Sequence, residues 1–238
     1  MTESAHGVAR HTALPFYDWL DREDNTPLRA CLGRGDGGHQ PRGPALAGYG
    51  PAGVPLGDTT GGGGGGGHFA RDLAEVYPAF SVIVQDLPRV IRQTVEDQKN
   101  SPGSGSITYQ AHNFFAEQPV KNADVYFMRH IFHNHPDAEC VKILEALLPA
   151  LKQGARVLVS EYIVPPPAEL TGGLGSKPMR QMDLLTMALF NAKERTKDEY
   201  SRLFQQASPA LVFQDIHQVP DDPRSCIFEA VYQGANDI

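Results

Sequence analysis

Hydrophobic and polar residues follow two recurring patterns from Gly63 to the end of the chain. Short apolar runs between turns are typical of buried parallel strands, whereas apolar positions three or four residues apart indicate helices. Strands are predicted at Phe80–Val84, Ile107–Gln110, Asp124–Met128, Arg156–Val164, Leu211–Ile216 and Ser225–Tyr232. Helices are predicted at His68–Tyr77, Val90–Glu96, Pro136–Lys152, Met179–Leu189 and Lys193–Gln206. This alternation predicts an α/β open sheet that ends in a pair of strands.

Two of these helices carry clear end signals. In the first, an apolar stripe is formed by Leu144, Leu147, Leu148 and Leu151. Lys152 suits the last turn of that helix, and Gly154 suits the left-handed position after it. In the second, Thr196 followed by Glu199 is typical of a capping box at a helix start. Both helices are therefore predicted with defined ends.

The beginning of the chain has a different composition. Residues 33–67 hold 16 of the 24 glycines, ending in the unbroken run Gly61–Gly67, and few large apolar side chains. Such a segment buries too little apolar surface to offset the entropy lost on ordering it. We therefore expect a short helical segment over residues 1–32, a disordered linker over 33–62 and a folded domain over 63–238.

Charge and cysteine content exclude several classes of protein. Lys and Arg number 21 against 28 Asp and Glu, and a net charge of -7 disfavours nucleic-acid binding. No apolar run approaches the ~18 residues of a membrane span, and the first residues lack a signal-peptide pattern. Three cysteines are too few for a disulfide framework. We expect a cytoplasmic protein that binds neither nucleic acid nor membranes.

Asp86 lies two residues beyond the predicted strand Phe80–Val84, after Gln85. Open parallel sheets bind ligands at the carboxyl ends of their strands, where a carboxylate can accept hydrogen bonds from a ribose diol. The alternative is an ordinary turn residue before Leu87 and Pro88. The run Gly61–Gly67 could similarly approach a ligand or serve as a linker, but no P-loop lysine follows it.

The segment RHIFHNHPD follows the strand Asp124–Met128. Its residue His133 could be a general base, because a neutral imidazole accepts protons near pH 7. His130, His133 and His135, with Asp137, could instead bind a metal ion. A histidine-rich surface loop is the third possibility.

Two glutamates and a methionine-rich helix complete the candidates. Glu161 interrupts the apolar strand Arg156–Val164, so it either marks the end of the buried strand or has a partner such as an imidazole, because a buried carboxylate is costly unless paired. Glu194 could simply place negative charge at a helix start. The helix Met179–Leu189 is more typical of a core than of a pocket, although thioethers pack well on flat aromatic ligands.

Four of these stretches together resemble S-adenosylmethionine-dependent O-methyltransferases that act on phenols in plant and fungal secondary metabolism. They are GGGGGHF at 63–69, VQDLPRVI at 84–91, DVYFMRHIFHNHPD at 124–137 and KERT at 193–196. The resemblance extends from Gly63 to Tyr232. It implies a Rossmann-like methyltransferase sheet with helices on both faces, S-adenosylmethionine as cofactor, and an aromatic acceptor.

The resemblance also implies roles for individual residues. Those expected to bind the cofactor are Gly63, Gly65, Gly67, Asp86, Leu87, Asn113, Phe114 and Arg129. His133 is expected to be the catalytic base, with Glu161 and Glu194 orienting its imidazole. Met187 is expected to contact the aromatic acceptor, and no metal is expected.

The sequence departs from the family pattern in several places. No apolar run corresponds to the family's first strand, which is therefore expected to be missing or disrupted, and Gly61 stands at its acidic position. His135 stands where a tryptophan is usual, and Asn113 where an aspartate is usual. Most of the N-terminal region that makes the family homodimeric is absent, so residues 1–32 resemble its remnant. Two alternatives follow: a cofactor-binding or inactive auxiliary protein that does not methylate, and a metal-dependent hydrolase using His130, His133 and His135.

Overall fold

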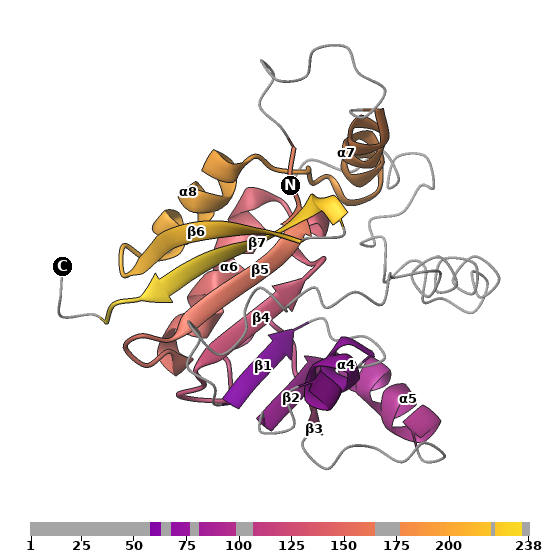
Figure 1. The fold of residues 1–238 in the computed structure, drawn as a ribbon, viewed down its shortest axis with the longest axis vertical. Helices are drawn as coiled ribbons and strands as arrows, with labels where there is room; N and C mark the ends of the chain where they lie inside the picture. The colour runs from indigo at the N-terminus through magenta and orange to yellow at the C-terminus, as the bar shows by residue number, and fades with distance from the viewer. Residues whose placement is uncertain are drawn as a thin grey trace.

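The computed structural model describes residues 58–62, 68–76, 81–98, 107–164, 177–219 and 222–234. They form a seven-stranded sheet in the order β3-β2-β1-β4-β5-β7-β6 (Figure 1). The strands are β1 Asp58–Gly62, β2 Ser81–Asp86, β3 Ile107–Ala111, β4 Val125–Arg129, β5 Arg156–Tyr162, β6 Leu211–Val219 and β7 Asp222–Tyr232. Strands β1 to β5 are parallel, and β7 pairs antiparallel with both β5 and β6. The predicted α/β open sheet is confirmed.

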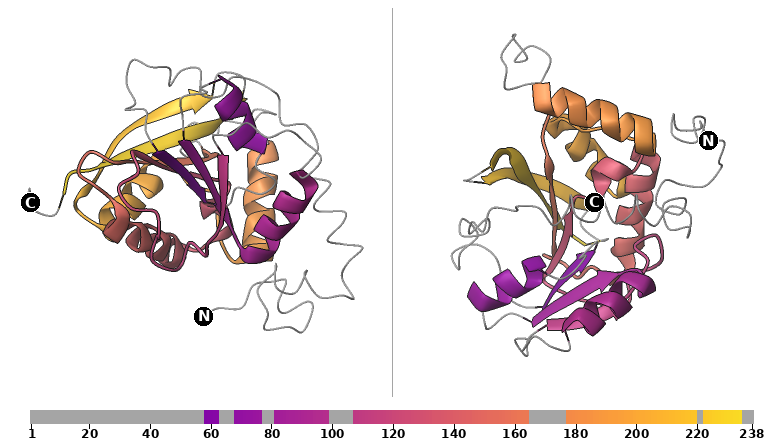
Figure 2. Two further views of the ribbon diagram at one scale, coloured as in Figure 1. Left: turned by 90° about the horizontal axis from the view of Figure 1, so that it is seen from below. Right: turned by 90° about the vertical axis from the view of Figure 1, so that its right-hand side faces the viewer.

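Helices cover both faces of this sheet, as predicted. They are α4 His68–Val76, α5 Pro88–Gln98, α6 Asp137–Leu147, α7 Lys177–Phe190 and α8 Lys197–Ala207, with short 3-10 helices η3 Phe132–Asn134 and η4 Leu148–Ala150. Helix α4 lies in front of the sheet in Figure 1, and α6 and α8 lie behind it; Figure 2 shows this layering from two other sides. No helix within these described ranges is both long and apolar enough to cross a membrane.

Strand β1 corrects the expectation that the first strand is missing. It pairs in parallel with β2 on one side and with β4 on the other, so that Gly61 is level with Val84 and with Phe127. Its sequence, DTTGG, has no apolar run, but strand pairing depends on backbone groups that every non-proline residue carries. The strand lies inside the predicted linker 33–62. Residues 1–57, including the predicted helical segment 1–32, lie outside the described residues.

Helix α6 ends earlier than its leucine stripe predicts. The helix stops at Leu147, and Leu148–Ala150 continue as the 3-10 helix η4. Pro149 explains this end, because proline donates no backbone hydrogen bond and its ring crowds the preceding turn. Gly154 does have a positive φ of 81°, but it lies in the turn before β5. The expected role of Gly154 at the helix end is therefore wrong.

The main hydrophobic core lies between strands β4, β5 and β7 and helices α6 and α8. Tyr200 stacks on Phe228 with ring centres 3.9 Å apart, and the Tyr126 hydroxyl donates to the carbonyl of Ala150. Phe132 of η3 is fully buried in this core. Because Phe132 is fixed there, its neighbour His133 is held at the carboxyl edge of the sheet. The capping box of Thr196 and Glu199 at the start of α8 is confirmed.

Candidate active site

The strand order reverses between β1 and β4, which are neighbours in the sheet. Such a switch point, at the carboxyl ends of the strands, is where open α/β sheets bind ligands. The register places Asp86 and Arg129 one residue beyond the row Gln85, Gly62 and Met128. Neighbouring strands are about 4.8 Å apart, so β2 and β4 are separated by about 10 Å across β1. That separation suits a nucleoside lying across the end of β1.

The glycines expected to bind the cofactor, Gly63, Gly65 and Gly67, lie outside the described residues. Their flanking elements are described: β1 ends at Gly62 and α4 begins at His68. The glycine run therefore connects a parallel strand to a helix, which is the context of dinucleotide-binding turns. The sequence offered no apolar strand to predict this context.

His133 lies in η3, and its partner Glu194 lies before α8. Nδ1 of His133 is 3.2 Å from Oε1 of Glu194, whose side chain is fully buried. An ionised carboxylate can only accept hydrogen bonds, so Nδ1 carries the proton and Nε2 keeps the free lone pair. Glu194 is fixed by Asp183, which accepts a hydrogen bond from its backbone N–H at 2.9 Å. The hydroxyl of Thr186 donates to the same carboxylate at 3.4 Å.

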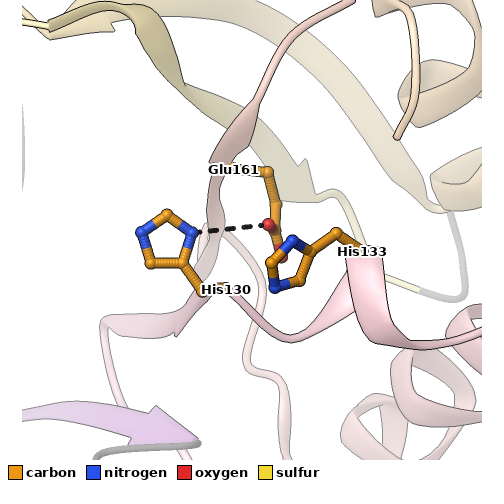
Figure 3. Close-up of side chains that lie close together, drawn as sticks. All are labelled: His130, His133 and Glu161. Carbon is orange, nitrogen blue, oxygen red and sulfur yellow. Dashed lines mark ion pairs between the residues drawn. The ribbon is translucent and has the colours of Figure 1, made fainter. Parts of the chain in front are cut away.

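Glu161 is fully buried near the end of β5. Its Oε1 accepts hydrogen bonds from the backbone N–H groups of Ile131 and Phe132, both at 2.7 Å. Its Oε2 faces His130, whose Nδ1 lies 3.7 Å away, as Figure 3 shows. Glu161 therefore holds the backbone between β4 and η3 directly and contributes negative charge beside the two imidazoles.

Burial and neighbouring charges shift the pKa values of His133 and Glu161 in opposite directions. Burial alone would lower the pKa of His133, but the hydrogen bond with Glu194 and the charges of Glu161 and Glu194 raise that pKa above its ordinary value. Burial alone would raise the pKa of Glu161, but the His130 and His133 imidazoles and the N–H of Phe132 lower that pKa overall. The site thus stabilises the protonated form of His133 relative to a free imidazole and the ionised form of Glu161 relative to a free carboxyl group.

Arg195 was assigned no role by the sequence, although it lies in the KERT stretch. Its guanidinium is fully buried and donates to the carbonyls of Phe132 and His135, at 2.6 and 2.7 Å. Its Nε also donates to Asp137 at 2.8 Å. Arg195 therefore ties η3 and the start of α6 to the segment that carries Glu194. Only the KERT resemblance pointed to this position, since no helical or strand pattern marks it.

The residues expected to contact adenine lie after β2 and β3. The backbone N–H of His112 donates to the carbonyl of Asp86 at 2.8 Å, which joins the two segments. Asp86 accepts a hydrogen bond from the N–H of Leu87 at 2.7 Å, and Leu87 is 45% exposed. Asn113 is exposed as well and accepts from the N–H of Phe115. An apolar and an amide side chain are thus available beside Asp86.

Aromatic rings border this region on both sides. His135 meets the rings of Phe114 and Phe115 edge-on, with centres 5.6 and 5.3 Å away. Across the sheet end, the Arg129 guanidinium lies 5.7 Å from the ring centre of Phe69 in α4. Arg129 therefore points toward the helix that follows the glycine run.

Met187 lies on α7 and is 54% exposed, beside the exposed Leu184 and Leu185. Helix α7 contacts η3, and it lies beyond the carboxyl ends of β4 and β5 in Figure 1. Helix α7 therefore brings exposed apolar side chains to the same end of the sheet as His133, and the contact of Met187 with an acceptor stays a prediction.

The metal-binding alternative is only partly supported. His135 pairs with Glu139 at 2.9 Å and Asp137 pairs with Arg195, so neither is turned toward His133. Burial raises the pKa of the Cys140 thiol to about 12, and its Sγ donates to the carbonyls of Phe132 and His135. The metal-ligating side chains that do gather in the described part of the chain are those of His130, His133 and Glu161.

Comparisons with known proteins agree with this architecture. A sequence model of the O-methyltransferase domain matches residues 56–208. The chain is similar to O-methyltransferase pyvH of Aspergillus violaceofuscus, with 38% identity over 165 residues, covering 69% of this chain and 38% of the relative. It is also similar to a chlorophenol O-methyltransferase of Trichoderma longibrachiatum, with 40% identity over 164 residues, covering 68% and 34%. The chain spans about a third of the length of the curated relatives it matches.

Among solved structures, that of mitomycin 7-O-methyltransferase MmcR superimposes with a TM-score of 0.80 at 21% identity. The match covers 97% of this chain and 63% of that one. At this identity the likeness concerns the fold, and it confirms the methyltransferase-type sheet.

Proposed function

The chain belongs to the O-methyltransferase family, and we propose that it transfers the methyl group of S-adenosylmethionine to a phenolic hydroxyl of an aromatic secondary metabolite. The proposed acceptor class is supported by the phenol in the name of the Trichoderma relative and by the exposed apolar side chains on α7. The proposed chemistry is supported by the buried imidazole–carboxylate pair of His133 and Glu194, which is the observation that carries the proposal.

The proposed cofactor site extends along the carboxyl ends of β2, β1 and β4. Asp86 would accept hydrogen bonds from the ribose hydroxyls, and Leu87 and Asn113 would contact the adenine. Phe114 would close that side, while Arg129 and the glycines at 63, 65 and 67 would hold the methionine part. Support comes from the strand order, because β1 lies between β2 and β4 at the switch point where open α/β sheets bind ligands. When bound, S-adenosylmethionine supplies an activated methyl group and a neutral sulfide leaving group.

His133 would act on the acceptor hydroxyl. A phenol has a pKa of about 10, so it is mostly protonated near neutral pH. Nε2 of His133 would take that proton as the oxygen bonds to the methyl carbon, and Glu194 would stabilise the imidazolium that results. Glu161 would hold the His133 segment in place through the N–H groups of Ile131 and Phe132.

A His133→Ala variant tests this proposal. We expect methyl transfer to a panel of phenols to fall by about 100-fold or more, because the general base is lost. Affinity for S-adenosylmethionine, measured by calorimetry, should stay within a few-fold, since His133 is not expected to bind the cofactor. His217→Ala is the matched control, because it removes another imidazole–carboxylate pair, with Glu229 at 2.8 Å, on the edge strand β6.

The outcomes separate the candidate functions. Full turnover by His133→Ala would contradict the assignment of the base. Cofactor binding by the wild type without turnover on any phenol would contradict the enzymatic proposal and favour an auxiliary protein that does not methylate.

A further inference from the structure

His130, His133 and Glu161 converge from different elements at the carboxyl edge of the sheet. Figure 3 shows Glu161 projecting from β5, His130 directly after β4, and His133 from η3. One ligating atom from each lies within 4.8 Å of the other two. Nδ1 of His130 and Oε2 of Glu161 are 3.7 Å apart. Two imidazoles and a carboxylate thus surround one small volume.

Two of the atoms that face this volume are unsatisfied. Among the described residues, neither Nδ1 of His130 nor Oε2 of Glu161 has a hydrogen-bond partner, although both atoms are buried. The Glu161 side chain is fully buried, and its other oxygen is occupied by two backbone N–H groups. A buried polar atom without a partner carries a desolvation cost of about 1–3 kcal/mol, and more for a charged group. A cation between these side chains would remove that cost.

The backbone holds His130 in this arrangement. Its φ of 52° is in the left-handed region, which is uncommon for residues other than glycine. Its N–H donates to the carbonyl of Ser160 at 3.0 Å, and the register of β4 with β5 places His130 level with Glu161. The convergence of the imidazole and the carboxylate therefore follows from the strand register.

We propose that His130, His133 and Glu161 form an inhibitory binding site for a divalent transition-metal ion, specifically Zn²⁺. Zinc accepts imidazole nitrogen and carboxylate oxygen at about 2.0–2.2 Å in tetrahedral geometry, which separates the ligating atoms by about 3.4 Å. The 3.7 Å between His130 and Glu161 is close to that separation. The ligating atom of His133 lies within 4.8 Å of the other two, so a small movement of its side chain would complete a set of three ligands with an open fourth position. Mg²⁺ prefers six oxygen ligands and does not fit this set.

The ion disables His133 whichever of its nitrogens is bound. A neutral imidazole has one lone pair, and the second nitrogen carries a proton. Once zinc takes the lone pair, no site remains on His133 that accepts a proton from a phenol. This inhibition rests on the proposed function, whereas zinc binding itself does not.

Calorimetry with ZnCl₂ tests the site on the full chain, purified without a histidine tag and freed of metal. We expect one equivalent of zinc bound per wild-type chain, and at least about 10-fold weaker binding by His130→Asn. Asparagine tolerates a left-handed backbone, so this substitution removes the imidazole without strain at φ. His135→Asn is the matched control and should bind zinc as the wild type does, because His135 is engaged with Glu139. MgCl₂ should give no saturable heat.

The site is overturned if the wild type binds no zinc, or if His130→Asn, folded by circular dichroism, binds zinc as tightly as the wild type. The latter result would place the ion elsewhere. In methyl-transfer assays, added zinc should reduce turnover of the wild type by a larger fraction than that of His130→Asn, each relative to its own zinc-free rate. Zinc binding without any methyl transfer would contradict the proposed function and leave the metal site standing.

Discussion

At the scale of single residues, His133 depends on carboxylates that come from distant parts of the sequence. Glu194 follows it by 61 residues, and Glu161 lies on a different strand. The sequence marked His133 as a possible base, Glu161 as a carboxylate in an apolar strand, and Glu194 as a charge at a helix start. Their pairing came from the resemblance, since local patterns do not report which residues meet in space. The structure was needed to see that Glu194 contacts the His133 ring, whereas Glu161 accepts hydrogen bonds from the backbone beside it.

The pH dependence of methyl transfer should reveal the Glu194 carboxylate. This charge favours the imidazolium and raises the pKa of His133. The base works only when neutral, so kcat/KM should rise with pH through that raised pKa. In Glu194→Gln the charge is lost, the pKa of His133 falls, and the acid limb of the profile should move to lower pH. Turnover at the plateau should fall by roughly tenfold, or about 1.4 kcal/mol, because the imidazolium loses its counter-charge.

The control for this profile is Glu139→Gln, which alters the carboxylate that faces His135. Its acid limb should coincide with that of the wild type. If the Glu194→Gln limb stays in place or moves to higher pH, Glu194 does not control the titrating base.

At the scale of secondary-structure elements, Arg195 joins η3 and α6 to the segment before α8. Three of its hydrogen bonds cross between these elements, to Phe132, His135 and Asp137. Lysine cannot reproduce them, because it lacks the planar fork of a guanidinium. The position of the His133 segment therefore depends on a residue outside the catalytic pair.

An Arg195→Met variant should be destabilised by about 3 kcal/mol, since it leaves buried carbonyls without donors and Asp137 with Lys193 alone as its cationic partner. For a chain of this size that corresponds to a fall of about 6–12 °C in the thermal midpoint. Arg202→Met, on the exposed side of α8, should change stability by less than about 0.5 kcal/mol. Equal midpoints for the two variants in a thermal melt would show that Arg195 does not stabilise the segment.

The sequence predicted best those helices and strands whose apolar residues recur at regular intervals. Strands β2, β4 and β5 and helix α8 were recognised within a few residues, because burial imposes their patterns. Strand β1 was missed because glycine and threonine carry no such pattern, and neighbouring strands on both sides supply its backbone partners. The end of α6 was misplaced because the leucine stripe was given more weight than Pro149.

At the scale of the whole molecule, the parallel strands bring separate motifs to one edge. Asp86 follows β2, the glycine run follows β1, and His133 follows β4, although they are far apart in sequence. The open-sheet topology was predictable from alternating patterns, and it is the reason that these motifs meet. The matched relatives are about twice as long as this chain, so the acceptor side of their sites can include residues beyond the aligned region.

We expect Asp86 to anchor the nucleoside of S-adenosylmethionine at this edge of the sheet. Calorimetric titration of the purified chain with S-adenosylmethionine tests it, comparing Asp86→Ala with Asp215→Ala. Asp215→Ala is the matched control, because the carboxylates of Asp86 and Asp215 each accept a hydrogen bond from the backbone N–H of the next residue at 2.7 Å. We predict one cofactor per wild-type chain, affinity reduced about 10-fold to 100-fold in Asp86→Ala, and unchanged affinity in Asp215→Ala. Absence of binding by the folded wild type, or equal affinity in Asp86→Ala, would contradict the account.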